Sequence, residues 1–312
     1  MIEKLAVSSM RLARHHTLIF HRVLNEQDPM SPDEPTAEWF RTLAGWLARR
    51  FEVISLAEAV RRAGNHGLRG PTVSITFDDG YADNFLVALP ILEEFALPAT
   101  FFVASGFIDG GRMWNDSIIE TVRRLQPGNY SLEDLSPTSF EISDWASRRH
   151  LANTAITAWK HLPPQERQGK VDGFSALVDD LPIDLMMSKA QLRLLAESRL
   201  STVGGHTRTH PILAALPDNA ARDEIESGKR DLEEWLQREI TLFAYPNGKL
   251  GRDYLRGHAE FVKEAGFRAA VATDWGTMDA ATDLFAIPRF TPWHTNLPRF
   301  AVDMARCHFG LI

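Results

Sequence analysis

The stretch SITFDDGYADN, residues 74–84, places two adjacent carboxylates and a glycine directly after an apolar segment with strand character. A turn at the end of a strand needs only one aspartate before its glycine. Asp78 and Asp79 carry like charges side by side and repel each other unless a positive charge lies beside or between them. A bound cation would remove this repulsion. The segment therefore predicts a metal site at a strand end, with its other ligands elsewhere in the chain.

A second cluster, GGHTRTHP, spans residues 204–211. His206 and His210 are four residues apart, a spacing that would place them on one face of a helix. Pro211 disfavours helical geometry at His210, and two glycines precede His206, so a strand followed by a tight loop is expected instead. Two histidines and a carboxylate with open coordination positions suit a catalytic zinc ion. The alternative is a pair of histidines in a surface loop.

The two clusters complement each other. Adjacent side chains along an extended segment point to opposite sides, so Asp78 and Asp79 can take different roles. One can bind a metal while the other acts as a base. Both clusters follow predicted strands, and the active sites of parallel β/α barrels lie at the C-terminal ends of the strands.

The composition of the 312 residues is that of an ordinary globular protein, with 44% hydrophobic and 24% charged residues. A net charge of −7 argues against nucleic acid as the main partner. No apolar run approaches the length of a membrane span, and Arg11 and Arg14 interrupt the first apolar stretch, so neither a transmembrane segment nor a signal peptide is expected. A cytoplasmic location follows as the expectation. The single cysteine, Cys307, excludes an internal disulfide.

Short apolar segments alternate with amphipathic ones along the chain. The predicted strands are residues 17–23, 71–77, 99–104, 201–207, 241–246, 267–273 and 284–290. The predicted helices of the same unit are residues 36–51, 82–95, 220–240, 253–265 and 298–308. This alternation indicates βαβ units and a parallel sheet or barrel.

Residues 112–187, approximately, break the alternation and have no strong strand pattern. Residues 114–125 and 145–162 have helical patterns, and residues 136–143 are expected to form a loop or a short strand. Ser188 and Gln191 have the spacing of a capping box, which marks the return to the main fold. We therefore expect a single domain over residues 1–312 with a mainly helical insertion.

TFDDG (76–80) followed by HTRTHP (206–211) resembles the first two motifs of the polysaccharide deacetylase family, the NodB-homology domain of carbohydrate esterase family 4. FAYPNGKLG (243–251) is similar to the third motif, and residues 269–290 are similar to the region of the fourth. The resemblance implies an α/β fold, a distorted (β/α)₇ barrel. It also implies Zn²⁺, or another divalent cation such as Co²⁺, Ni²⁺ or Mn²⁺, as cofactor. The implied reaction removes N-acetyl groups from an amino-sugar glycan or glycoconjugate and releases acetate.

The resemblance also implies roles for single residues. Asp79, His206 and His210 would be the metal ligands, and Asp78 would be the general base for the attacking water. The backbone N–H of Asn247 would bind the oxyanion together with the metal.

Two features depart from the family pattern. The third motif usually starts with an arginine that orients the base, but Phe243–Tyr245 precede Pro246 here. Arg289, at the end of a later predicted strand, is the candidate replacement, and an ordinary ion pair at the edge of the core is the alternative.

The family's last motif, a leucine and a histidine near the C-terminus, is also missing from its usual place. LIFHRV (18–23) resembles it instead, as in a circularly permuted group of exopolysaccharide deacetylases. His21 is therefore the predicted general acid, which protonates the leaving amine, and His294 is the alternative. The remaining histidines have no supporting context and are expected at the surface: His15, His16, His66, His150, His161, His258 and His308.

Tyr81 and Trp275 are the candidates for packing against a sugar ring, and Trp114 opens the insertion near the predicted site. The expected partner is an N-acetylated saccharide substrate. Two other functions remain open at this point: a related C–N hydrolase acting on a small amide or cyclic ureide, and a non-catalytic carbohydrate-binding module. The complete Asp-His-His set favours the deacetylase, because binding alone needs no metal to activate water.

Overall fold

The computed structural model describes residues 13–65, 67–68, 70–291 and 296–311. Its centre is a parallel sheet with the strand order β1-β3-β4-β7-β8-β9, in which β2 also pairs with β3. The strands are β1 (His15–Phe20), β2 (Glu52–Val53), β3 (Thr72–Phe77), β4 (Ala99–Val103), β7 (Ser201–Gly205), β8 (Leu242–Ala244) and β9 (Ala269–Val271).

The sheet curls round on itself through residues 287–290. Ile287 pairs with Val271 of β9, and Phe290 pairs with Leu18 of β1, each through a single parallel bridge. The predicted strand 284–290 is therefore reduced to two bridged positions, yet it joins the last strand of the sheet to the first. The prediction of an α/β fold with a distorted (β/α)₇ barrel is confirmed.

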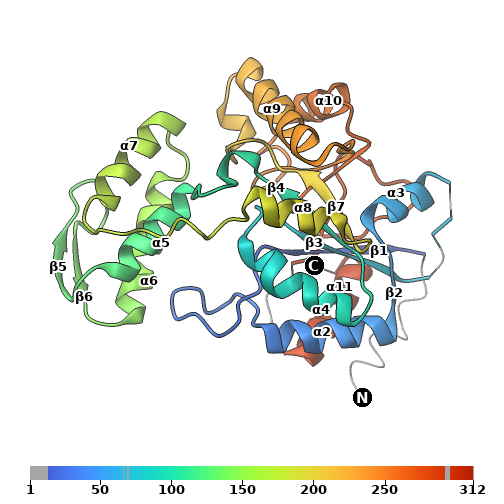
Figure 1. Cartoon of the computed structure of the whole chain (residues 1–312), viewed down its shortest axis with the longest axis horizontal. Helices are drawn as coiled ribbons and strands as arrows, with labels where there is room; N and C mark the ends of the chain where they lie inside the picture. Colours follow the sequence, from blue (N-terminus) through green and yellow to red (C-terminus); the bar gives the residue numbers. More distant parts are fainter. Residues whose placement is uncertain (1–12, 66, 69, 292–295, 312) are drawn as a thin grey trace.

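Helices cover the outside of the barrel (Figure 1). Four of them begin at a capping side chain, Thr36, Ser55, Ser188 or Asn296, each of which accepts a hydrogen bond from the first turn. The predicted helix 82–95 is divided into a π-helical turn, Asn84–Ala88, and α4. The barrel helices are α2 (Ala37–Arg50), α3 (Leu56–Gly64), α4 (Leu89–Glu94), α8 (Lys189–Glu197), α9 (Asp218–Leu236), α10 (Arg256–Glu264) and α11 (Leu297–His308).

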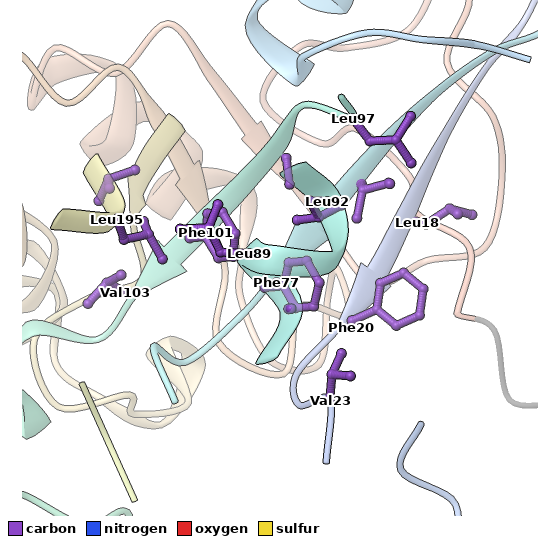
Figure 2. Close-up of a cluster of buried hydrophobic side chains, with 14 of the residues drawn as sticks. Leu18, Phe20, Val23, Phe77, Leu89, Leu92, Leu97, Phe101, Val103 and Leu195 are labelled. Atoms are coloured by element: carbon purple, nitrogen blue, oxygen red, sulfur yellow. The ribbon is translucent and has the colours of Figure 1, made fainter. Parts of the chain in front are cut away.

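Both faces are buried along the whole length of β1, β3, β4, β8 and β9, which explains their largely apolar sequences. On the outer face, Phe20, Phe77 and Phe101 are neighbours in register across β1, β3 and β4, and their rings stack 5.1–5.5 Å apart. Figure 2 shows this row packed beneath α4. Phe102, the next residue, belongs instead to the separate apolar cluster that contains Val271 and Ile287. Because the row supports the strand ends that carry the site, truncating Phe77 to alanine would cost about 3–5 kcal/mol.

The insertion forms a lobe beside the barrel, at the left of Figure 1. It contains a β-hairpin as well as helices, a feature that the sequence indicated only as a loop or short strand at 136–143. An apolar cluster of its own, which includes Ile118, Leu151 and Phe174, fills its interior. The lobe elements are α5 (Trp114–Arg124), β5 (Gly128–Ser131), β6 (Ser139–Ile142), α6 (Trp145–Trp159) and α7 (Pro164–Ser175).

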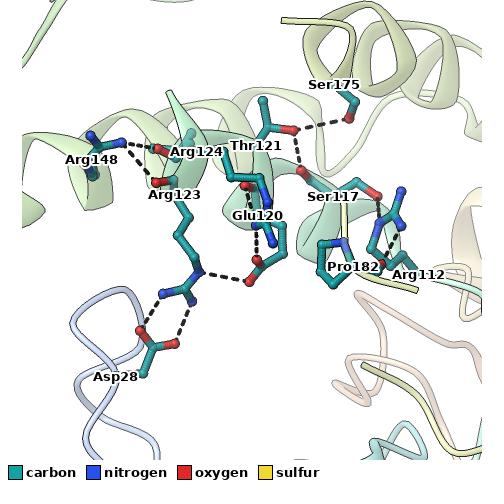
Figure 3. Close-up of polar contacts among 11 residues, drawn as sticks. Asp28, Arg112, Ser117, Glu120, Thr121, Arg123, Arg124, Arg148, Ser175 and Pro182 are labelled. Carbon is teal, nitrogen blue, oxygen red and sulfur yellow. Dashed lines mark hydrogen bonds and ion pairs between the residues drawn. The ribbon is translucent and has the colours of Figure 1, made fainter. Parts of the chain in front are cut away.

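The loop that follows β1 is attached to this lobe. Met30 belongs to the apolar cluster of the lobe. Arg123 of α5 donates two hydrogen bonds to the Asp28 carboxylate, at 2.8 and 2.6 Å (Figure 3). Arg149 of α6 also donates to the carbonyl of Pro29. The loop that leaves the barrel after His21 is thus fixed from the lobe side.

Several histidines expected at the surface are buried, so that expectation was wrong for them. His15 Nδ1 lies 2.8 Å from Thr72 Oγ1, and His16 Nε2 lies 3.1 Å from Nδ1 of His308 in α11. Burial lowers the pKa of His15 to about 3, so its ring is neutral and packs as part of the core. His258 is buried as well and caps α10 by accepting from the Leu255 N–H.

His150 and His161 are exposed as expected, and His66 lies outside the described residues. Among the helices that the structure describes, none is long and apolar enough to cross a membrane.

Candidate active site

The three candidate metal ligands meet at the C-terminal ends of β3 and β7. Asp79 follows β3, and His206 and His210 lie in the loop after β7. The Nε2 atom of each histidine lies 3.3 Å from Asp79 Oδ1. The three ligand atoms all lie within 4.8 Å of one another, as one ion would require.

The chemistry of these atoms fits a divalent cation. Asp79 Oδ1 is buried and has no hydrogen-bond partner in the described part of the chain. His206 Nδ1 lies 2.7 Å from the carbonyl oxygen of Ala244, which must accept its proton, so Nε2 is the ring nitrogen that faces Asp79. Burial lowers the pKa of His210 to about 4, which keeps that imidazole neutral. Burial acts in the same direction on His206, but the neighbouring Asp79 and Asp78 outweigh it and raise the pKa of His206. A carboxylate and two imidazoles are a donor set suited to zinc.

The site loops hold unusual backbone conformations. Asp79, Thr207, His210 and Asn247 have positive φ angles of 79°, 61°, 54° and 59°. Such conformations cost on the order of 1 kcal/mol or more in residues other than glycine and concentrate at functional sites. They lie at the strand ends where the sequence predicted the chemistry.

Asp78 is held by Arg289. The guanidinium donates from both terminal nitrogens to the two carboxylate oxygens, each at 2.7 Å, and from Nε to the carbonyl of Ala272 at 2.8 Å. Arg289 is completely buried. Burial alone would raise the pKa of Asp78, but the charge of Arg289 lowers it below its usual value, so the carboxylate is ionised. This contact is the one expected of an arginine that replaces the missing first residue of the third motif.

A cavity of about 520 Å³ opens above these residues. His21, which follows β1, lines it beside the candidate ligands, and Arg289 lies behind Asp78. His294, the alternative acid, lies outside the described residues. The other predicted site residues that line the cavity are Asp78, Asp79, Tyr81, His206, His210, Asn247 and Trp275.

The two predicted sugar-packing residues differ in exposure. Trp275 is 37% exposed and packs edge-on against Phe290, so part of its ring remains accessible. Tyr81 is buried, its hydroxyl donates to Asp116 at 2.9 Å, and the Arg22 guanidinium lies 4.7 Å from its ring centre. This geometry favours Tyr81 as part of the cavity wall rather than as an open stacking surface.

Helix α9 supports the histidine loop, a contribution that the sequence did not reveal. Glu224 accepts hydrogen bonds from the backbone N–H groups of Arg208 and Thr209, at 3.0 and 2.7 Å. A Cβ added to Gly228 would lie 2.6 Å from the carbonyl carbon and oxygen of Thr207, so only glycine fits there without a shift. Both residues lie in a charged helix, and no local sequence pattern distinguishes them from its other residues.

The lobe supplies the opposite wall of the cavity. Trp114 of α5, Lys160 at the end of α6 and Arg167 of α7 all line it. Trp114 was expected near the site, whereas the two cations were not predicted.

Comparisons with known proteins agree with this architecture. No curated protein matches the sequence. Among solved structures, IcaB from Ammonifex degensii has a TM-score of 0.60 at 20% identity, covering 93% of this chain and 97% of that one. BC0361, a polysaccharide deacetylase from Bacillus cereus, has a TM-score of 0.60 at 14% identity, covering 94% and 69%. The Streptococcus pyogenes deacetylase PplD, in complex with acetate, has a TM-score of 0.54 at 16% identity, covering 89% and 92%.

At these identities the structural likeness establishes the fold. The family assignment comes from the sequence model named "Polysaccharide deacetylase", which matches residues 65–270. This range contains Asp78 and the three candidate metal ligands, whereas His21 and Arg289 lie outside it. Because the match spans well over half of the 312 residues, the chain belongs to the polysaccharide deacetylase family.

Proposed function

We propose that the protein is a metal-dependent hydrolase that removes N-acetyl groups from an amino-sugar glycan or glycoconjugate and releases acetate. The observation that carries the proposal is the convergence of Asp79, His206 and His210 beside an ion-paired Asp78 in one cavity. The family supplies the deacetylase class, and the metal and the N-acetyl substrate are the finer steps proposed here.

Asp79, His206 and His210 would hold the cation, with Zn²⁺ favoured by the donor set. A divalent cation there would polarise the acetamide carbonyl and make water a stronger nucleophile near neutral pH. Asp78 takes the proton from the attacking water, and Arg289 keeps its carboxylate ionised and fixed in direction.

The backbone N–H of Asn247 donates to the oxygen that becomes negative, since Asn247 lines the cavity. His21 donates a proton to the leaving nitrogen from the β1 side of the cavity. Trp275 presents the accessible part of its ring to the sugar. We also propose that residues 1–312 form one domain, with the lobe as its insertion.

Metal content and acetate release test this function together. The purified protein is compared with His206→Ala and His210→Ala by elemental analysis, with the exposed His161→Ala as the matched control. We expect metal in the wild type and the control only. Acetate release from N-acetylglucosamine oligomers should stop on chelation and return with Zn²⁺. Equal metal content in all four proteins, or turnover that survives chelation, would refute the proposal.

A further inference from the structure

The cations on the barrel side of the cavity are paired with acids. Arg22 Nε lies 2.8 Å from an Asp83 carboxylate oxygen. Lys249 Nζ lies 3.4 Å from a carboxylate oxygen of Asp274 and donates to a backbone carbonyl at 2.8 Å. These side chains are neutralised by the protein itself and have little reason to attract an anionic ligand.

The two cations on the lobe wall differ from them. Arg167 is only 8% exposed, and its guanidinium lies 4.8 Å from the ring centre of Trp114. One of its nitrogens donates to the backbone carbonyl of Lys160 at 3.2 Å, which brings the two residues together. Within residues 13–65, 67–68, 70–291 and 296–311, neither cation has a carboxylate at ion-pair distance.

A partly buried cation without an ion-pair partner is energetically unfavourable unless an anion balances its charge. Burial lowers the pKa of Arg167, and burial also lowers that of Lys160, with the nearby charges of Asp253 and Arg252 acting in opposite directions. The guanidinium lies over the Trp114 ring, and as a planar group it has nitrogen donors in the geometry that carboxylate and phosphate oxygens accept. Trp114 and the backbone hydrogen bond fix Arg167 in place without neutralising it.

We propose that Arg167 and Lys160 form an anion subsite on the lobe wall, which binds a carboxylate or phosphate group carried by the N-acetylated substrate. The subsite rests on the proposed function for the reaction, since the acetamide of the same molecule must reach Asp79 on the barrel side. It selects anionic glycans or sugar phosphates over neutral ones. It also orients them, with the negative group toward the lobe and the acetamide toward the strand ends.

Three matched substrates test the subsite: the neutral N-acetylglucosamine trimer, the same trimer oxidised to a carboxylate at its reducing end, and the trimer 1-phosphate. For the wild type we expect kcat/KM to be about tenfold or more higher with an anionic trimer, because a hydrogen bond to a charged group typically contributes that factor or more. The difference should lie in KM and should shrink as salt is added. Whichever anion shows it identifies the carboxylate or the phosphate as the natural group.

The variants Arg167→Gln and Lys160→Met remove one charge each at similar side-chain length. Each should reduce the preference for the anionic trimer by about tenfold and leave the neutral trimer unchanged. Arg167→Lys should restore part of it. Lys170→Met is the matched control, because Lys170 lies in the same helix and pairs with Asp134 on the lobe surface. Should Arg167→Gln fail to fold, Lys160→Met carries the test alone.

Binding to the His21→Ala protein, measured by calorimetry, separates this proposal from the proposed function. Preferential binding of an anionic trimer to this variant, together with no acetate release from any trimer by the metal-loaded wild type, would support the subsite and refute the function. Equal kcat/KM for all three trimers, unaffected by either variant, would overturn the subsite while the deacetylase activity stands. A loss that is the same for neutral and anionic trimers would also overturn it, since it would make Arg167 a structural residue.

Discussion

The charged side chains on the two walls of the cavity differ in whether they have ion-pair partners. On the barrel wall, Asp78 is paired with Arg289, and His206 is oriented by the carbonyl of Ala244. On the lobe wall, Arg167 and Lys160 line the cavity, and among the described residues neither has a carboxylate at ion-pair distance. A wall whose charged side chains are already held in place by the protein is suited to chemistry, which requires a fixed geometry before the substrate arrives. A wall with unpaired cations is suited to substrate selection, because an anionic group of the substrate can provide the missing ion-pair partner.

Asp78→Asn tests the catalytic role of the barrel wall and is expected to have the largest effect. We expect kcat on an N-acetyl substrate to fall by about 10²–10⁴-fold, the usual contribution of a general base, while the metal remains bound. Metal content is measured in the same sample, and Asp134→Asn on the lobe surface is the control. Since asparagine leaves Arg289 as a buried unpaired charge, circular dichroism must verify folding. Near-wild-type kcat would mean that the two aspartates have other roles.

His21→Ala tests the third side of the cavity, at the end of β1. An amide leaves slowly until its nitrogen is protonated, so we expect kcat on an N-acetyl substrate to fall by about 10²-fold. An activated acetate ester needs no such proton, and its hydrolysis should fall much less. The two substrates are compared on the same metal-loaded preparation. An equal loss on both would make His21 structural or a ligand, and no loss on either would transfer the role to His294.

Gly228→Ala would disturb the histidine loop through helix α9, although Gly228 itself does not line the cavity. The added methyl group collides with the carbonyl of Thr207, so the loop that carries His206 and His210 must shift. We expect metal affinity to fall about 10–100-fold, the range seen when outer support of a ligand is lost. Titration with a competing chelator measures this. Gly257→Ala in α10 is the control, because its added methyl meets nothing within 4 Å and should leave the affinity unchanged.

The smallest effect is expected at the contact between the barrel loop and the lobe. Asp28→Asn removes a partly buried ion pair with Arg123, and the free energy of unfolding should fall by about 1 kcal/mol. Urea denaturation measures the change. Glu239→Gln breaks the far more exposed pair with Arg268 and should change nothing measurable. Equal stability of both variants and the wild type would mean that Asp28 does not help to hold the loop to the lobe.

The site residues that could be predicted from the sequence are those at the ends of the strands. Asp78, Asp79, His206 and His210 each follow an apolar strand, and parallel strands bring their carboxyl ends to one edge. Arg289 was predicted only as a candidate, because its pairing with Asp78 depends on a segment that joins the sheet through isolated bridges. The fold was therefore predictable from the alternation of apolar and amphipathic segments. The site was predictable from the polar residues that directly follow the predicted strands.

Features that depend on tertiary contacts could not be predicted from the local sequence pattern. His16 and His308 are far apart in sequence and become buried only because α11 packs against β1. Gly228 resembles any other glycine in a polar helix until Thr207 lies against it. Arg167 sits in a helix with little amphipathic pattern, so its place on the cavity wall depends on how the lobe packs.

The closure of the sheet has a consequence for the order in which the site assembles. The histidine loop requires β3, β4, β7, β8 and α9, whereas β1, which directly precedes His21, is completed by Phe290 from the far end of the fold. Contacts between residues distant in sequence form slowly, because the intervening chain must first be closed into a loop. During refolding from urea, we expect metal binding to recover before hydrolysis of the N-acetyl substrate does. Simultaneous recovery in stopped-flow measurements would show that the barrel closes in one step, with the acid and the metal side formed together.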